Sequence, residues 1–242
     1  MTDQDISSKR RLLLLSNSTN FGETFLAYPE SAIKAFLGSA VKTIAFIPYA
    51  GVTISYADYA WKVEERFLEW GYEVLSLHNR HDKVGTLRAV DAIMIGGGNT
   101  FHLLAELYRY QLLNPIREMI AQGKPYIGWS AGSNVACPTI MTTNDMPIVG
   151  PPSLNALRLI PFQLNPHYID AKPDGQAGES RADRLNEFIT VNRDVPVVGL
   201  TEGSILRFEG PDITIIGDKP VKIFKYGQEV REVLAGEELR NI

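Results

Sequence analysis

The residues with the clearest chemical signature are Gly128-Trp129-Ser130-Ala131-Gly132, a serine between two glycines. A short strand is predicted just before them, over 124–127, and a helix can open just after them, over 133–137. This arrangement is typical of a nucleophile elbow, whose sharp turn pushes the serine hydroxyl out above the sheet edge. The alternative, a chance G-x-S-x-G with Ser130 as a helix N-cap, is less favoured because strand, turn and helix signals are all present.

A serine hydroxyl is a poor nucleophile at neutral pH and needs a neighbouring base. Of the four histidines, His78 and His81 lie in a polar stretch that predicts a surface turn. His102 falls in the first turn of a predicted helix, and His167 directly follows Pro166, whose rigid backbone helps to fix the imidazole. By elimination and setting, His167 is the predicted base; the alternative is a structural histidine in a turn.

The base needs an acid that orients it and stabilises the imidazolium. Glu202 follows a predicted buried strand and precedes a glycine, so it is expected at the sheet edge. Asp145 follows the nucleophile helix, with a turn before Pro147 as its alternative role. Order along the chain does not choose between these two acids, since triads occur in several orders.

Acyl transfer also needs donors for the tetrahedral oxyanion. The N–H group of Ala131 is the expected first donor, and Gly97 and Gly98 offer unobstructed N–H groups for the second. The competing interpretation is a phosphate cradle over 96–100 at a helix start. That signal is weak because the segment matches neither glycine-rich nucleotide motif.

These residues require a scaffold, and the first 140 residues predict one by alternating strands and helices. The predicted strands cover 11–16, 43–48, 72–77, 92–95 and 126–129, and the helices 31–36, 56–70, 100–109 and 115–122. Continuous apolar strands indicate a mostly parallel sheet covered on both faces, with ligands beyond the carboxyl ends of the strands. Short strands over 196–200, 205–208, 213–216 and 221–224 predict C-terminal β-hairpins that close one side of the sheet. We expect one α/β domain over 1–242, with a polar N-terminal extension over 1–10.

Composition excludes several classes of function. The 242 residues are 45% apolar and carry a net charge of −4, so no basic field is available to hold nucleic acid. The single cysteine, Cys137, excludes an internal disulfide and a cysteine-based zinc cage. The start of the chain lacks the apolar region of a signal peptide, and no apolar run near it is long enough to span a membrane. We therefore expect a cytoplasmic protein, without membrane or nucleic-acid partners.

Several motifs in order resemble the peptidase E family of bacterial α-aspartyl dipeptidases. They are Gly96 to Phe101, Ile127 to Gly132, Cys137 to Ile140, Thr142 to Val149, and Asn165-Pro166-His167. The resemblance runs from about Leu12 to about Phe224 and so covers nearly the whole chain. One such motif alone is a weak signal, whereas this many in order is specific.

The resemblance implies a serine peptidase on a three-layer, flavodoxin-like fold related to class I glutamine amidotransferases, which carry cysteine at the elbow. It implies cleavage of dipeptides with an N-terminal aspartate, without metal or cofactor, through Ser130 and His167. Glu202 matches the family's acid and is favoured, while Asp145 matches a residue also proposed for the charge relay. Arg181 matches the proposed specificity arginine, which suits a substrate carboxylate. Near the glycine loop, Asn99 and Thr100 are expected to contact substrate, with Gly98 and Ala131 as the oxyanion donors.

Two alternative functions stay open at this point. Related enzymes release aspartyl dipeptides from the storage polymer cyanophycin, which requires an open cleft. A non-catalytic small-molecule sensor on the same scaffold is also compatible with the fold, since folds host many functions. The sensor hypothesis predicts a missing or displaced base. The presence of His167 and of two candidate acids argues against it. The sequence leaves the oligomeric state as a monomer or a homodimer.

Overall fold

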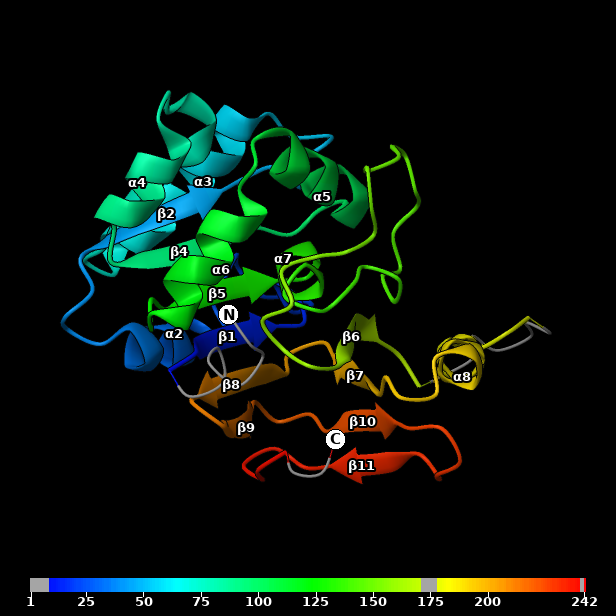
Figure 1. Ribbon diagram of the computed structural model, residues 1–242. Coiled ribbons are helices and arrows are strands. Elements are labelled where there is room, and N and C mark those ends of the chain that lie inside the picture. Colours follow the sequence, from blue (N-terminus) through cyan, green and yellow to red (C-terminus); the bar gives the residue numbers. More distant parts are fainter. Residues whose placement is uncertain (1–8, 171–177, 240–241) are drawn as a thin grey trace.

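A seven-stranded sheet forms the centre of the molecule (Figure 1). The computed structural model describes residues 9–170, 178–239 and 242. The strand order is β3-β2-β4-β5-β1-β8-β9, in which the first five strands are parallel and β8 and β9 are antiparallel. The strands are β1 (Arg11–Leu15), β2 (Thr43–Ile47), β3 (Glu73–Ser76), β4 (Ala92–Ile95), β5 (Tyr126–Trp129), β8 (Ile205–Glu209) and β9 (Asp212–Ile216). The predicted parallel sheet is therefore confirmed, and all five predicted strands of the first half are present.

Alternating side chains of the parallel strands enter two separate hydrophobic cores. In β1, Leu12 and Leu14 belong to one core, and Leu13 and Leu15 belong to the other. All four leucines are fully buried, because helices cover both faces of the sheet. Burial on both faces explains why these strands are continuous apolar runs instead of alternating ones.

Helices form the outer two layers. On one face lie α2 (Glu30–Leu37) and α3 (Tyr56–Glu69), which begins at the N-cap Ser55. On the other face lie α4 (Lys83–Ala89), α5 (Thr100–Arg109), α6 (Leu113–Ala121) and α7 (Ala131–Asn134). A short 3-10 turn, η1 (Leu77–Asn79), follows β3. The arrangement matches the predicted three-layer α/β fold, although α4 was not predicted.

A second, four-stranded sheet lies beside the first, and it corrects part of the prediction. Its order is β11-β10-β7-β6, with bounds β6 (Gln163–Tyr168), β7 (Val197–Thr201), β10 (Val221–Phe224) and β11 (Arg231–Val233). Only the β8–β9 hairpin extends the main sheet, whereas β7 and β10 pair with each other in the second one. Helix α8 (Arg181–Val191) packs on this smaller sheet through Leu185 and Ile189 (Figure 1).

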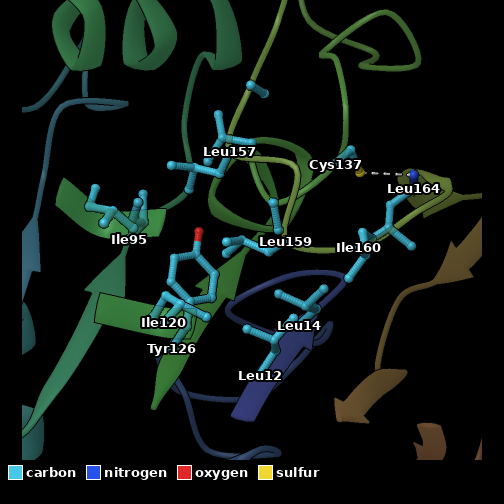
Figure 2. Packing of buried hydrophobic residues seen from close by; sticks show 14 of the residues in the cluster. Leu12, Leu14, Ile95, Ile120, Tyr126, Cys137, Leu157, Leu159, Ile160 and Leu164 are labelled. Carbon is cyan, nitrogen blue, oxygen red and sulfur yellow. Dashed lines mark hydrogen bonds between the residues drawn. The ribbon is translucent and has the colours of Figure 1, made fainter. Parts of the chain in front are cut away.

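The core around β1 and β5 holds the single cysteine, as Figure 2 shows. Cys137 is fully buried, and its sulfur accepts a hydrogen bond from the Leu164 backbone N–H at 3.1 Å. Nearby, the Tyr126 hydroxyl donates to the Gly132 carbonyl at 2.6 Å, which ties the middle of the core to the turn after β5. A packed interior of this kind transmits the position of each strand to the loops at its end.

Most of the predicted polar N-terminal extension, residues 1–8, lies outside the described residues. Arg10, which the prediction included in it, is part of the folded structure: only 7% of it is exposed. Its guanidinium lies 5.0 Å from the centre of the Phe208 ring and donates to the Gly210 carbonyl at 3.0 Å. Burial lowers the pKa of Arg10 from its ordinary value. Within the described part of the chain, no helix is both long and apolar enough to cross a membrane.

Candidate active site

Ser130 stands at the end of β5 and directly before α7, where the chain reverses. Its backbone has φ 51° and ψ −111°, a conformation that L-residues rarely adopt and that costs about 1–3 kcal/mol. Ser130 occupies the N-cap position of α7, but its side chain makes no capping hydrogen bond. Instead its N–H group donates to the Leu15 carbonyl at 3.1 Å, which fixes the turn against β1. The hydroxyl is therefore free to point away from the helix.

Close backbone contacts leave no room for a Cβ atom at either glycine of the elbow. A Cβ atom added to Gly128 would lie 2.5 Å from the Gly132 carbonyl oxygen. One added to Gly132 would lie 2.1 Å from the Ile95 carbonyl oxygen, in the neighbouring strand β4. Both distances are far below van der Waals contact. The G-x-S-x-G spacing thus follows from the way β5, α7 and β4 meet.

Three side chains form a continuous line of hydrogen bonds. The Ser130 Oγ atom lies 2.9 Å from His167 Nε2, and His167 Nδ1 lies 2.7 Å from Glu202 Oε1. A proton on Nδ1 satisfies both contacts, because Nδ1–H then donates to the carboxylate and Nε2 accepts from the serine hydroxyl. This is the arrangement of a nucleophile, a base and an orienting acid.

His167 reaches Ser130 from the second sheet, and the connection between the sheets positions it. The β6–β7 register shifts between Pro166 and Tyr168, and His167 itself has φ 54°. Its N–H group donates to Ser16 Oγ at 2.9 Å, and the Ser16 hydroxyl lies 2.8 Å from the Leu200 carbonyl on β7. A bulge of this kind redirects one side chain without breaking the strand. The alternative for His167, a structural histidine in a turn, does not describe it, because His167 lies within β6 and its Nε2 atom lies 2.9 Å from Ser130 Oγ.

A second polar residue after β1 holds the turn that carries Glu202. The Asn17 Oδ1 atom accepts from the Gly203 N–H at 3.0 Å, so the loop after β1 is bound to the loop after β7. The sequence predicted a strand over 11–16 and missed the roles of Ser16 and Asn17. The available signal was a pair of polar residues directly after a fully apolar strand, at the edge where the site was expected.

Asp145, the other candidate acid, is engaged elsewhere. Its carboxylate accepts from Thr100 N at 2.7 Å and Thr100 Oγ1 at 2.5 Å, and Thr143 Oγ1 lies 3.1 Å away. Asp145 therefore holds the first turn of α5, which follows the glycine loop. Glu202, and not Asp145, makes the hydrogen bond with His167, because the loop over 142–147 packs against α5. The alternative role for Asp145, a turn before Pro147, does not account for its contacts with Thr100, which lies 45 residues earlier in the chain.

The glycine loop after β4 lies against the nucleophile. A Cβ atom on Gly97 would lie 3.1 Å from the Ser130 Cβ atom, and one on Gly98 would lie 2.1 Å from the Ala50 carbonyl oxygen. Asn99 N already donates to that carbonyl at 2.8 Å. The amides of Gly98 and of Ala131, the residue after the nucleophile, are thus the nearby candidates for an oxyanion hole.

Asn99 and Thr100, the two residues expected to contact substrate beside this loop, differ in their position relative to the cavity. The Asn99 side chain accepts from His102 N at 3.0 Å and donates to the Met146 carbonyl at 2.9 Å, while Asn99 still lines the cavity beside Ser130. Thr100 is fully buried, and its hydroxyl donates to Asp145. The Thr100 hydroxyl is thus engaged at the start of α5, and Thr100 is not among the described residues that line the cavity.

Cys137, His78 and His102 make contacts that do not involve Ser130. Burial raises the pKa of the Cys137 thiol to about 12, so the thiolate is not available near neutral pH. His78 Nδ1 lies 2.7 Å from Ser76 Oγ, and His102 Nε2 lies 2.9 Å from the Tyr56 hydroxyl. No group of three or more His, Cys, Asp or Glu residues in the described chain is arranged to hold a metal ion.

Arg181 is the first residue of α8, after the N-cap Ser180. It is half-buried, and burial, with a smaller contribution from Arg184, lowers the pKa of its guanidinium. It makes no hydrogen bond or ion pair with any residue that the structure describes, whereas Arg184 lies 3.9 Å from the Glu179 carboxylate. Among the described residues that line the cavity at Ser130, Arg181 does not occur. The structure thus does not bring Arg181 into direct contact with the nucleophile.

The loops at the carboxyl ends of β1, β2, β4 and β5 enclose a cavity of about 650 Å³. Ser130 and His167 both line it, so the reacting groups open into a space of the size that small ligands occupy. A strained serine on a strand-to-helix elbow, paired with a histidine and a glutamate on a three-layer α/β fold, defines a serine hydrolase.

Similarity to known proteins gives the particular family. The sequence model of Peptidase family S51 matches residues 12–216, and the chain belongs to this family. It is 51% identical to Peptidase E of Nostoc sp. over 92% of each chain. It is 47% identical to Peptidase E of Shewanella baltica, over 95% of this chain and 97% of that one. The predicted family is confirmed: the chain is a peptidase, and the family and its relatives support a serine dipeptidase.

Two solved structures share the fold at lower sequence identity. A putative peptidase E protein from Listeria monocytogenes EGD-e superposes with a TM-score of 0.64 at 24% identity, covering 86% of this chain and 98% of that one. A peptidase from an acI-B1 Actinobacterium superposes with a TM-score of 0.67 at 20% identity, covering 96% and 97%. The α/β architecture is therefore that of solved peptidases.

Proposed function

We propose that this chain hydrolyses dipeptides with an N-terminal aspartate through an acyl-enzyme on Ser130. The observation that carries the proposal is the hydrogen-bonded line from Ser130 through His167 to Glu202, at 2.9 and 2.7 Å. A sensor without catalytic activity has no need of a base aligned with a strained serine. The family membership supplies the peptide bond as the bond to be broken.

The reaction follows from the positions of these groups. His167 Nε2 removes the hydroxyl proton as Ser130 Oγ attacks the aspartyl carbonyl carbon, and the Gly98 and Ala131 amides receive the oxyanion. The imidazolium, stabilised by Glu202, then gives its proton to the leaving amine as the C–N bond breaks. Water, deprotonated by His167, attacks the resulting ester and releases aspartate. Ser130 regains its proton, so the enzyme returns to its starting state.

Recognition of the aspartyl side chain requires a cation, and Arg181 is our candidate. Its guanidinium is half-buried and has no partner among the described residues, so a substrate carboxylate can bind it in two places at once. Arg184, three residues later, is more exposed and lies near Glu179, which makes it the matched control. Asn99, at the cavity wall, is proposed to contact the substrate beside the oxyanion donors.

The test compares Asp-Leu and Ala-Leu as substrates in the presence of a chelator. We expect cleavage of Asp-Leu only, with Ser130→Ala reducing kcat by more than about a thousandfold because the covalent step is lost. Arg181→Met is expected to raise KM for Asp-Leu, and Arg184→Met to leave it unchanged. Equal cleavage of both peptides would disprove the specificity, and wild-type turnover by Ser130→Ala would disprove the mechanism.

A cytoplasmic location belongs to the same proposal, and the one buried, unpaired cysteine supports it. We also propose that residues 1–242 form a single domain. The oligomeric state, monomer or homodimer, is measurable by sedimentation.

A further inference from the structure

The active-site cavity contains a lysine that the proposed reaction does not use. Lys62 lies in the second turn of α3, is exposed, and lines the same cavity as Ser130 and His167. No acidic side chain of the described residues forms an ion pair with it. Its Nζ atom lies 4.3 Å from the centre of the Phe25 ring.

The aromatic contact gives this ammonium a defined position. Phe25 meets Trp129 edge to face, with ring centres 6.3 Å apart and an interplanar angle of 76°. Trp129 is itself fully buried and directly precedes Ser130. Lys62 is thus linked through the Phe25 ring to Trp129, the residue beside the nucleophile. A cation over a ring face is held without losing its charge.

Part of the cavity wall is apolar, several other lining side chains are neutral and polar, and no negatively charged side chain occurs in the described lining. Val52, Ile54 and Ile148 line the cavity with side chains that are 52%, 37% and 51% exposed. No aspartate or glutamate occurs among the described residues of the lining. Apart from His167, Lys62 is the one basic side chain among the described lining residues. The cavity therefore offers apolar surface and one positive charge.

The two halves of an Asp-X dipeptide differ in what they require. The aspartyl half carries an ammonium group, which needs an acidic or carbonyl acceptor, as well as a side-chain carboxylate. The X half carries only a side chain and a free carboxylate, with no positive charge. Apolar side chains and one cation, without an acid in the described lining, fit the X half. Arg181, proposed for the aspartyl side chain, is absent from the described lining.

We propose that Lys62 binds the free C-terminal carboxylate of the substrate, with X packing against Val52, Ile54 and Ile148. This inference rests on the proposed function, and it gives a physical reason for the restriction to dipeptides. In a longer peptide, the carboxylate that Lys62 binds is replaced by a neutral amide. The ion pair is partly solvated, so we expect its contribution to be about tenfold in affinity.

The test combines variants of Lys62 with a substrate that lacks the C-terminal negative charge. The kcat/KM of Asp-Leu is compared with that of Asp-leucinamide for the wild type, Lys62→Met and Lys62→Arg. We expect the wild type to prefer the free acid by about tenfold or more. Lys62→Met should lose this preference through a higher KM for Asp-Leu, with little change for the amide. Lys62→Arg should retain most of the preference.

Lys83 is the matched control, since its Nζ atom also lies over a ring, 4.6 Å from the centre of Tyr110, but outside the cavity. Lys83→Met is expected to behave as the wild type. Equal losses of Lys62→Met on the acid and the amide would overturn the proposal, as would a wild type that does not distinguish them. A changed ratio of Asp-Leu to Asn-Leu in Lys62→Met would assign the lysine to the aspartyl side chain and would overturn it too.

The failure of the proposed function has a different signature. It would appear as a wild type that cleaves no Asp-X substrate, or as a Ser130→Ala variant that keeps its activity, and the Lys62 proposal would then fall with it. Cleavage of Asp-Leu that depends on Ser130 but not on Lys62 rejects the carboxylate site alone.

Discussion

Replacement of Glu202 by glutamine removes one charge from the line of hydrogen bonds and little else. Glutamine has the same shape, and its amide oxygen can still accept from His167 Nδ1. The tautomer of the imidazole is therefore kept, while the imidazolium formed in the transition state loses its counter-charge. Asp145→Asn is the matched control, because Asp145 contacts Thr100 and Thr143 instead of His167.

The size of the effect follows from the distance and the exposure of the pair. His167 Nδ1 and Glu202 Oε1 are 2.7 Å apart, and the two side chains are 39% and 51% exposed. Two unit charges about 4 Å apart attract by about 1 kcal/mol in water and about 4 kcal/mol at an effective dielectric constant of 20. Half-exposure places this pair between the limits, at about 1.5–3 kcal/mol, or roughly 10- to 150-fold in kcat. This is well below the roughly ten-thousandfold effect known for a buried triad aspartate.

The assay is the steady-state hydrolysis of Asp-Leu at low and high salt. We expect Glu202→Gln to lower kcat with little change in KM, and the difference from the wild type to shrink in 1 M salt, where the screening length falls to about 3 Å. A kcat within twofold of the wild type for Glu202→Gln, together with a large loss for Asp145→Asn at unchanged thermal stability, would refute the assignment of the acid.

Three further changes test the scaffold around the site. Asp145→Ala removes the hydrogen bonds that hold the first turn of α5, so we expect a loss of about 2 kcal/mol and a Tm lower by roughly 4–8 °C; an unchanged Tm would contradict this. Burial raises the pKa of Cys137 to about 12, so iodoacetamide at pH 8 should modify the unfolded chain but not the native one. Alkylation of the native protein with loss of activity would contradict this prediction. Gly132→Ala places a Cβ atom 2.1 Å from the Ile95 carbonyl oxygen, so activity should fall by more than about tenfold, whereas Gly150→Ala, with no atom within 4 Å, should be neutral. Equal behaviour of the two glycine variants would show that the elbow tolerates the shift.

The main sheet could be predicted because its strands are buried on both faces and therefore appear as uninterrupted apolar runs. Thr100 to Arg109 and Tyr126 to Trp129 have the predicted bounds; the Asn99 side chain caps the start of the helix, and Pro125 directly precedes the strand. The elbow could be predicted because its two glycines are visible in the sequence. The structure shows why they are there: a Cβ atom at Gly128 or Gly132 would clash with a neighbouring carbonyl.

The second sheet was missed because its pairing is non-local. Strand β6 contains Pro166, which in the sequence argues against a strand, and His167 after it adopts a positive φ in the structure. Its neighbour β7 lies some thirty residues later, and the pairing of the two strands overrides the local signal. The choice between Glu202 and Asp145 depended on that pairing, since β6 and β7 carry the histidine and the glutamate side by side. Ser16 connects them to β1; its place directly after an apolar strand marks it as a polar residue at the sheet edge but does not indicate its partners.

The most direct test of the central claim is the site at which a fluorophosphonate probe modifies the folded protein. The account predicts one adduct per chain, located on Ser130 by peptide mass spectrometry. The adduct should be slowed by Asp-Leu and greatly reduced in His167→Ala, since the imidazole must remove the hydroxyl proton. An unlabelled Ser130 in folded, wild-type protein, or labelling that His167→Ala leaves unchanged, would contradict the account.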